Sequence, residues 1–282
     1  MSYCLNTTAN EKSTLCVWEN ILNLSNYIPL LKLLVLRYLK SRYVGTKLGA
    51  IWHIASVMLS FAVYFFVFKY IFNFRLGSVD DSNLFFGLNI FLGLCHFLFF
   101  ADTVGEACNI IRSNRGLVLS IKFPLIIILL AKTIANSVQY YLSMLLCLIG
   151  FFLIGAVSLT DVMAICFSTV LFTIQVLASS IFVSVACHFF KDLEQLVKLL
   201  LSSMLFLSPV FFSLSSVSPK LQSYLMLNPI SVPIEFARQN LSGEQSTIQL
   251  EQIAIYFLAT IIWLAISLSV FKRAIGAVHE HM

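Results

Sequence analysis

Six long stretches of this chain carry no Asp, Glu, Lys or Arg, and each is at least nineteen residues long. They cover residues 49–68, 83–101, 133–160, 162–190, 199–219 and 252–271. A helix that rises about 1.5 Å per residue needs about 20 residues to cross a hydrocarbon core about 30 Å thick. Because that core offers no water to the backbone, a spanning segment satisfies its own amides as a helix. The pattern predicts an all-α integral membrane protein with six transmembrane helices.

Composition and charge placement fit this class. The chain is 59% hydrophobic and 11% charged, whereas soluble domains carry about 25% charged residues. With both termini in the cytoplasm, every Lys and Arg except Lys69, Arg75, Lys220 and Arg238 falls on the inner side or at an inner helix end. The positive-inside rule therefore predicts cytoplasmic termini. Topology, rather than nucleic-acid binding, accounts for the net charge of +5.

The predicted organisation is a polar cytoplasmic segment at residues 1–28, without the features of a cleaved signal peptide, and one transmembrane domain at residues 29–282. Residues 216–238 contain three prolines and an uncharged stretch too short to cross a membrane, which predicts a re-entrant or interfacial helical hairpin on the outer side. The six spans are placed at about 49–72, 83–103, 126–154, 162–188, 197–214 and 252–271.

A basic segment at residues 29–48 precedes the first span. On a helical wheel most of its leucines share one half, whereas Lys32, Arg37 and Lys40 share the other and Arg42 falls on the apolar half. Two interpretations are open. The segment is either an amphipathic helix along the inner leaflet or a basic flank that only orients the first span.

Catalytic and metal-binding sites are not expected in this chain. The seven cysteines are scattered without paired spacing and are interpreted as buried small hydrophobes. His53, His96 and His188 stand apart from one another along the sequence, whereas a membrane enzyme needs several polar groups at one depth. Among the polar residues near the third span, Lys132 is expected to extend to the inner headgroups.

A run of residues at this entry to the first span resembles the motif of membrane subunits of bacterial polysaccharide ABC exporters, of the O-antigen, teichoic acid and capsule type. The matching positions are Arg37, Lys40, Arg42, Tyr43, Leu48, Gly49 and Trp52. Further matches follow in order: Asn114 ahead of Phe123-Pro124, Phe-Phe-Lys-Asp-Leu at 189–193, Ser-Pro-Val at 208–210, Asn228-Pro229, and Arg238. Two positions depart from the pattern, because Tyr38 stands where an acidic residue is usual and Val57 where a proline is frequent.

The resemblance implies a six-span subunit of the bacterial inner membrane that carries a lipid-linked glycan, with O-antigen as the first candidate and capsule or teichoic acid as alternatives. Residues 45–49 are too short for a phosphate-binding loop, so ATP and Mg belong to a separate cytoplasmic ATPase. The implied assembly holds two copies of this chain and two ATPase subunits. An ion-coupled transporter is the weaker alternative, because it needs buried carboxylates or paired broken helices.

Roles for single residues are also implied by the resemblance. Residues 107–120 would form a coupling segment docked on the ATPase, against the alternative of a solvated basic loop. Coupling residues are Arg112, Asn114, Arg115, Lys191 and Asp192, and interfacial residues are Arg37, Lys40, Arg42, Tyr43 and Lys47. Channel or substrate candidates, each of which could instead pack in the core or against lipid, are Trp52, His53, Tyr64, Phe65, Phe206, Phe211 and Phe212. Outer-gate candidates are Pro209, Asn228, Pro229 and Arg238.

Overall fold

The computed structural model describes residues 24–41, 51–67, 70, 83–116, 124–155, 157–242 and 250–280. Every regular element within these ranges is a helix, as predicted. The α-helices are α2 (Leu24–Ser41), α3 (Ile51–Phe66), α4 (Asn83–Ser113), α6 (Leu125–Leu153), α7 (Leu159–Phe189), α8 (Leu193–Leu207), α9 (Pro219–Leu225), α10 (Ser231–Ser242) and α11 (Leu250–Glu280). One short 3₁₀ turn covers Leu214–Ser216.

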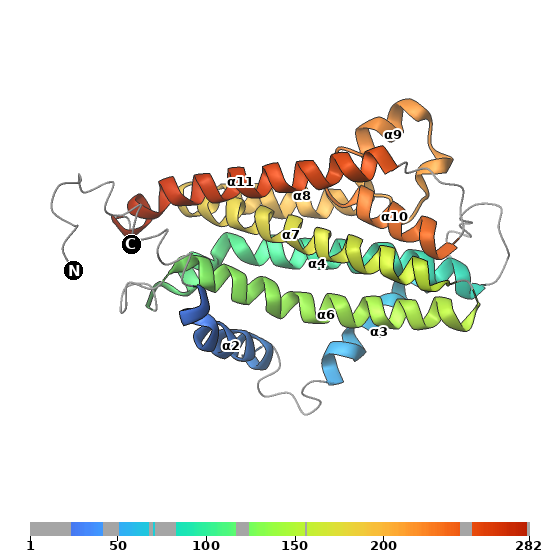
Figure 1. Cartoon of the computed structure of the whole chain (residues 1–282), viewed down its shortest axis with the longest axis horizontal. Helices are drawn as coiled ribbons and strands as arrows, with labels where there is room; N and C mark the ends of the chain where they lie inside the picture. Colours follow the sequence, from blue (N-terminus) through green and yellow to red (C-terminus); the bar gives the residue numbers. More distant parts are fainter. Residues whose placement is uncertain are drawn as a thin grey trace.

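Four long helices run side by side along the length of the molecule (Figure 1). Within the described part of the chain, four helices are long and apolar enough to cross a membrane: Phe85–Ser113, Leu125–Leu153, Leu159–Phe189 and Glu251–Ala274. They belong to α4, α6, α7 and α11 and coincide with the second, third, fourth and sixth predicted spans. The chain is therefore a multi-pass membrane protein.

The first and fifth predicted spans correspond to shorter helices. The helix α3 has 16 residues and α8 has 15, so α8 extends only about 22 Å at 1.5 Å per residue. The cause lies at Ser208-Pro209, because a proline disfavours helical backbone in the residue before it. Ser208 accordingly has extended backbone angles. The span predicted at 197–214 thus begins earlier, at Leu193, and ends earlier, at Leu207.

The helix α4 is at the centre of the packing. Its residues from Phe86 to Val104 form the middle of one apolar cluster, together with inward residues of α6 and α7, the turn that follows α8, and α10. A second apolar cluster joins the other end of α4 to the start of α6, the end of α7, Phe271 of α11, and α2. Because lipid gives no hydrophobic drive between helices, close van der Waals packing holds them together.

The helix α2 lies across the bundle beside the first residues of α6 (Figure 1). Leu34 is buried in the second apolar cluster and Tyr38 packs against it, whereas Lys32, Arg37 and Lys40 are exposed. One face of the helix therefore packs against the rest of the protein, and the other face, which carries the basic residues, is exposed. It covers the first part of the predicted segment 29–48, and Arg42, Tyr43 and Lys47 lie outside the described residues.

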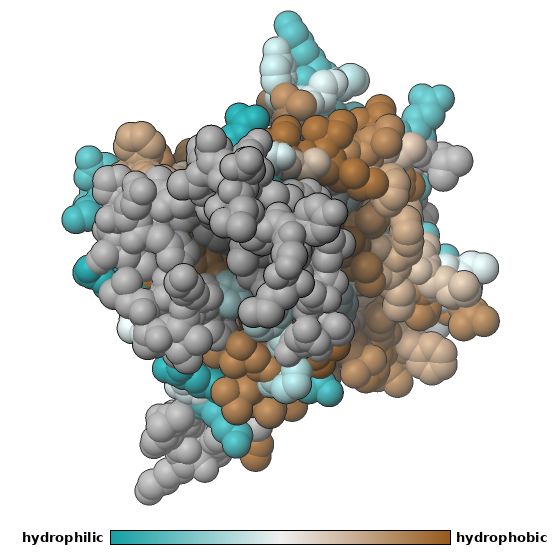
Figure 2. Space-filling view, turned by 60° about the vertical axis from the view of Figure 1, so that its left-hand side comes forward, coloured by the Kyte–Doolittle hydropathy of each residue, from teal (hydrophilic) through white to brown (hydrophobic). Residues whose placement is uncertain are grey.

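The outer surface of the bundle is apolar over a broad flank. Figure 2 shows hydrophobic residues covering one side of the molecule, while hydrophilic residues project around its edges. The helix α11 contributes Ile255, Leu258 and Ile262 to this surface, and each of these side chains is exposed. An apolar patch of this extent requires a cover, and lipid provides it for a multi-pass protein.

Gly93 and Gly105 on α4 provide a matched test of the central packing. A Cβ at Gly93 would lie 2.9 Å from the Cα of Val210, whereas a Cβ at Gly105 would meet only a side-chain methyl of Leu201 at 3.5 Å. We expect Gly93→Ala to destabilise the protein by about 1–3 kcal/mol, since backbone cannot yield as a side chain can. Thermal unfolding in detergent measures this. Gly105→Ala should be neutral or stabilising, and equal losses in both variants would contradict the assignment.

Candidate functional site

The chain after α8 turns back against the middle of α4 instead of continuing outward. Val210 and Leu214 in this turn are fully buried, and the backbone of Val210 lies against Gly93. A turn of this kind exposes carbonyl groups that no helix satisfies, and such groups need partners when they are buried. We call residues 208–214 the outer turn.

Arg238 of α10 supplies those partners. Its guanidinium donates hydrogen bonds to the carbonyl oxygens of Phe212 at 2.8 Å, Pro209 at 3.0 Å and Val210 at 3.3 Å. The side chain is completely buried. One side chain thus satisfies three carbonyl groups of the outer turn, which the five N–H donors of arginine make possible.

Glu235 completes this arrangement from one turn earlier on α10. Its carboxylate lies 3.0 Å from a guanidinium nitrogen of Arg238, and it accepts hydrogen bonds from the Leu214 amide at 3.2 Å and the Ser213 hydroxyl at 3.1 Å. Only 2% of the residue is exposed. The buried positive charge is therefore paired, as burial of a charge demands.

Asn228 binds the first residue of the outer turn. Its amide nitrogen donates to the Ser208 hydroxyl at 2.8 Å, and its amide oxygen accepts from the Ile230 amide at 3.1 Å. Pro229 is tied to α11, because the Tyr256 hydroxyl donates to its carbonyl oxygen at 3.5 Å. We call the group Ser208, Glu235, Arg238 and Asn228 the outer clasp.

Two of the four residues predicted at the outer gate, Asn228 and Arg238, belong to the outer clasp. Of the other two, Pro209 accepts a hydrogen bond from Arg238, and Pro229 follows Asn228 in the chain. Sequence analysis missed Glu235, although its position three residues before Arg238 on a predicted helix is a signal for an ion pair. The helices α9 and α10 supply the predicted hairpin, and α9 projects from one end of the bundle (Figure 1).

The four aromatic channel candidates whose side chains are described lie in different surroundings. Trp52 and Phe206 are exposed, on α3 and α8 respectively. Phe211 is buried in the apolar cluster around α4, with its ring 6.2 Å from that of Phe206. Phe212 is half-buried. The side chains of His53, Tyr64 and Phe65 lie outside the described residues.

At the opposite end of the bundle, Glu194 joins α4 to α8. Its carboxylate accepts hydrogen bonds from Asn109 at 2.6 Å and from Lys198 at 2.7 Å, and it lies 3.6 Å from Arg112. Arg112 also donates to the carbonyl oxygen of Cys187 at the end of α7. The hydrogen bonds from Lys198 and Asn109 lower the pKa of Glu194. We call these residues the inner network.

The predicted coupling residues divide into two groups. Arg112 and Asn114 are engaged within the protein, Arg112 in the inner network and Asn114 with the Ile110 carbonyl at 2.8 Å. Arg115, Lys191 and Asp192 are exposed, Arg115 beyond the end of α4 and the other two between α7 and α8. The second group is thus accessible to another protein.

Polar and ionisable groups also face each other between α4 and α6. Glu106 lies 3.1 Å from the ammonium of Lys132 and accepts a hydrogen bond from Asn136 at 2.7 Å. Lys132 was expected to extend to the headgroups. The structure places it against Glu106 instead, because α4 continues past the predicted end of its span and carries this carboxylate to α6.

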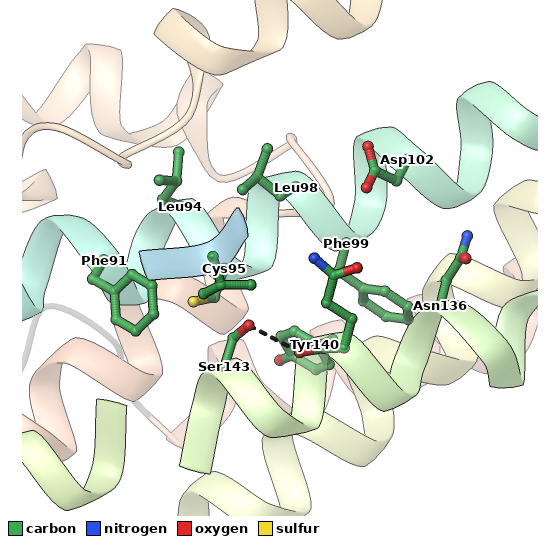
Figure 3. Close-up of a pocket in the computed structure, with 11 residues that line it drawn as sticks. Phe91, Leu94, Cys95, Leu98, Phe99, Asp102, Asn136, Tyr140 and Ser143 are labelled. Atoms are coloured by element: carbon green, nitrogen blue, oxygen red, sulfur yellow. Dashed lines mark hydrogen bonds between the residues drawn. The ribbon is translucent and has the colours of Figure 1, made fainter. Parts of the chain in front are cut away.

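A cleft next to this pair lies between α3, α4 and α6 (Figure 3). The rings of Phe99 and Tyr140 stack in it with centroids 4.6 Å apart, and Asp102 and Asn136 lie at the end away from Phe91. The residues described include no group of three or more His, Cys, Asp or Glu placed to hold a metal ion.

Long apolar helices, a polar clasp that supports a broken helix, and a basic helix across one end together define a multi-pass membrane transport subunit. The chain belongs to the ABC-2 type transporter family, whose sequence profile matches residues 29–242. This match includes most of α2, the inner network and the outer clasp.

Three relatives give the range of similar proteins. The chain is 24% identical over 255 residues to the O-antigen export system permease protein RfbA of Klebsiella pneumoniae, covering 89% of this chain and 94% of the relative. It is 28% identical over 216 residues to RfbA of Myxococcus xanthus, covering 73% and 78%. It is 21% identical over 242 residues to the polysialic acid transport protein KpsM of Escherichia coli, covering 85% and 91%.

The outer clasp generates a stability prediction. Arg238→Gln leaves Glu235 as a buried carboxylate without its cation, which should cost about 3–5 kcal/mol. The double variant Glu235→Gln with Arg238→Gln removes both charges and should recover part of this loss. Chemical unfolding in detergent measures both. The exposed pair of Lys198 with Glu194 provides the control, since Lys198→Gln should change stability little. A double variant less stable than Arg238→Gln would contradict the pairing.

The inner network generates a pH prediction. Because the pKa of Glu194 is lowered in the folded protein, its hydrogen bonds stabilise the fold above the ordinary carboxyl pKa of 4.5 and are lost as the pH falls below that value. Hydrogen exchange at the start of α8 should therefore stay level as the pH is lowered to 4.5 and rise as it is lowered further, after correction for intrinsic exchange. In Glu194→Gln the corrected exchange should not depend on pH in this range. An unchanged pH dependence in that variant would argue against Glu194.

Proposed function

We propose that this chain is the membrane subunit of an ATP-driven exporter that moves a lipid-linked polysaccharide across the bacterial inner membrane. The family match over residues 29–242 carries the proposal. The three relatives described above add the substrate class, because their names refer to O-antigen export and polysialic acid transport. O-antigen is the first candidate.

A capsular polysaccharide is the second candidate substrate. The polysialic acid transport protein KpsM matches nearly the same share of this chain as RfbA of Klebsiella pneumoniae does, 85% against 89%. Both substrates are long glycans, so the same transport path serves either. Export by two copies of the chain, each with one ATPase subunit that binds ATP and Mg, is common to both candidates.

The proposed topology has six spans and both termini in the cytoplasm. The positive-inside rule supports it, as does the position of the inner network, α2 and the end of α11 at one end of the bundle (Figure 1). In this arrangement α3 and α8 are the first and fifth spans. Leu199, Leu200 and Phe206 of α8 are exposed, and a second copy of the chain around a shared path would cover them.

The proposed coupling uses the exposed group of residues. Arg115, Lys191 and Asp192 would contact the ATPase, together with Phe190, which is 67% exposed. Arg112 and Glu194 would act differently, by fixing the ends of α4, α7 and α8 to one another. Closure of the ATPase pair would then displace these three helix ends as one body. At the other end of the bundle, the outer clasp would hold the outer turn in place at the exit of the transport path.

Export of glycan by the reconstituted complex tests the proposal. The chain alone should hydrolyse no ATP, and a P-loop ATPase expressed with it should co-purify and drive labelled glycan across a vesicle membrane. Phe190→Asp should weaken that co-purification, because it places a charge on an exposed aromatic contact. Leu258→Asn, on the exposed face of α11, is the control and should leave co-purification unchanged. Glycan movement driven by an ion gradient without ATPase would contradict the proposal.

A further inference from the structure

Tyr38 lies where α2 meets both α4 and α6. Its hydroxyl donates a hydrogen bond to the amide oxygen of Asn114 at 3.3 Å. Its ring lies beneath the ammonium of Lys132, 5.1 Å from ring centre to nitrogen. The hydroxyl therefore contacts the end of α4 while the ring contacts α6. We call Tyr38, Asn114, Lys132 and Glu106 the Tyr38 junction.

The end of α4 fixes the position of Asn114. Its amide nitrogen donates to the Ile110 carbonyl at 2.8 Å and to the Ser113 hydroxyl at 3.2 Å. The Ile110 carbonyl belongs to the last turn of α4, where helix carbonyls lack partners within the helix. Because both donor hydrogens of the amide are used in this way, its oxygen is oriented by α4 itself. The hydrogen bond to Tyr38 therefore depends on the position of the end of α4.

The position of Lys132 is set by a separate group of contacts. Its ammonium is held at 3.1 Å by Glu106, which also accepts from Asn136 at 2.7 Å. Asn136 donates further to the Thr103 hydroxyl at 3.2 Å. The Lys132 side chain is only 21% exposed, and partial removal from water strengthens attraction of a cation to an aromatic ring. The contact between Lys132 and the Tyr38 ring therefore depends on the position of α6.

We propose that Tyr38 is a positioning residue that makes α2 follow the cytoplasmic end of α4 during transport. This inference rests on the proposed function. If α4 moves relative to α6, Tyr38 cannot keep both contacts, because each is directional and short. Apolar contacts of Leu34 and its neighbours set no direction, whereas the hydrogen bond to Asn114 links α2 to the end of α4 in a defined geometry. A movement of the end of α4 at Asn114 would therefore reach the membrane surface through α2.

The chemistry of the hydroxyl supports this role. Burial raises the pKa of Tyr38, so the group stays protonated and acts as a donor at cellular pH. Three charged groups face it: Arg37 on its own helix, Glu106 of α4 and Lys132 of α6. Two cations and one carboxylate thus surround a neutral donor.

Two tyrosine variants separate positioning from stability. Tyr38→Phe removes the bond to Asn114 and keeps the ring under Lys132. Tyr141→Phe removes another interhelical tyrosine bond, from Tyr141 of α6 to the Thr173 hydroxyl of α7 at 2.8 Å, away from the junction. In the reconstituted complex with its ATPase, Tyr38→Phe should retain ATP hydrolysis but move about fivefold less glycan per ATP, which corresponds to one net hydrogen bond. Tyr141→Phe should keep the wild-type ratio.

A second measurement needs no substrate. Spin labels at Lys40→Cys on α2 and Gly116→Cys beyond α4, in a chain without its native cysteines, report the distance between the two elements. Lys40 is exposed, and a side chain at Gly116 meets no neighbouring atom within 4 Å. The distance distribution should be narrow in the parent chain, broader with Tyr38→Phe, and unchanged with Tyr141→Phe.

The outcomes distinguish this proposal from the proposed function. An unchanged transport ratio in Tyr38→Phe overturns the proposal, and so does an equal fall in Tyr141→Phe or an unchanged label distribution. A wild-type complex that moves no glycan contradicts the proposed function instead. In that case the label distances still decide whether Tyr38 holds α2 to α4.

Discussion

The hydrogen bonds from Arg238 to the outer turn are the interaction on which the outer half of this protein depends. A chain that breaks a helix inside a bundle exposes carbonyl groups, and lipid cannot satisfy them. Arg238 provides the donors and Glu235 balances the charge, so the turn can pack against Gly93 with Val210 fully buried. Without this pair, α8 would have to continue as a helix or end outside the membrane.

The two ends of the bundle use polar contacts in different ways. Ser208, Glu235 and Arg238 of the outer clasp are buried, and the clasp satisfies backbone groups, whereas the inner network joins the ends of three helices through partly exposed side chains. The first arrangement fixes one local structure. The second joins the ends of α4, α7 and α8, next to the exposed residues around Lys191. The proposed function would use both, a fixed structure at one end and a surface that can respond to a partner at the other.

Much of this architecture follows from the sequence, and the exceptions have physical causes. The uncharged runs predicted α4, α6, α7 and α11, and the three prolines predicted the outer hairpin. The predicted bounds of the fifth span were wrong, because hydropathy does not register the backbone effect of Pro209. The ion pair between Glu106 and Lys132 also could not be predicted from the sequence, because the two residues are 26 positions apart and meet only when α4 extends past its apolar run. Ser208, Asn228 and Arg238 of the outer clasp were predicted as motifs, whereas Glu235 was missed, and the contacts among the four required the fold.

The sharing of one guanidinium among three carbonyl groups has a kinetic consequence. Withdrawal of Arg238 breaks the hydrogen bonds to the carbonyl groups of residues 209, 210 and 212 together, because one guanidinium donates all three. The outer turn should therefore be released cooperatively, in one step with a single barrier. The lifetime of the packed outer turn would then be set by one side chain.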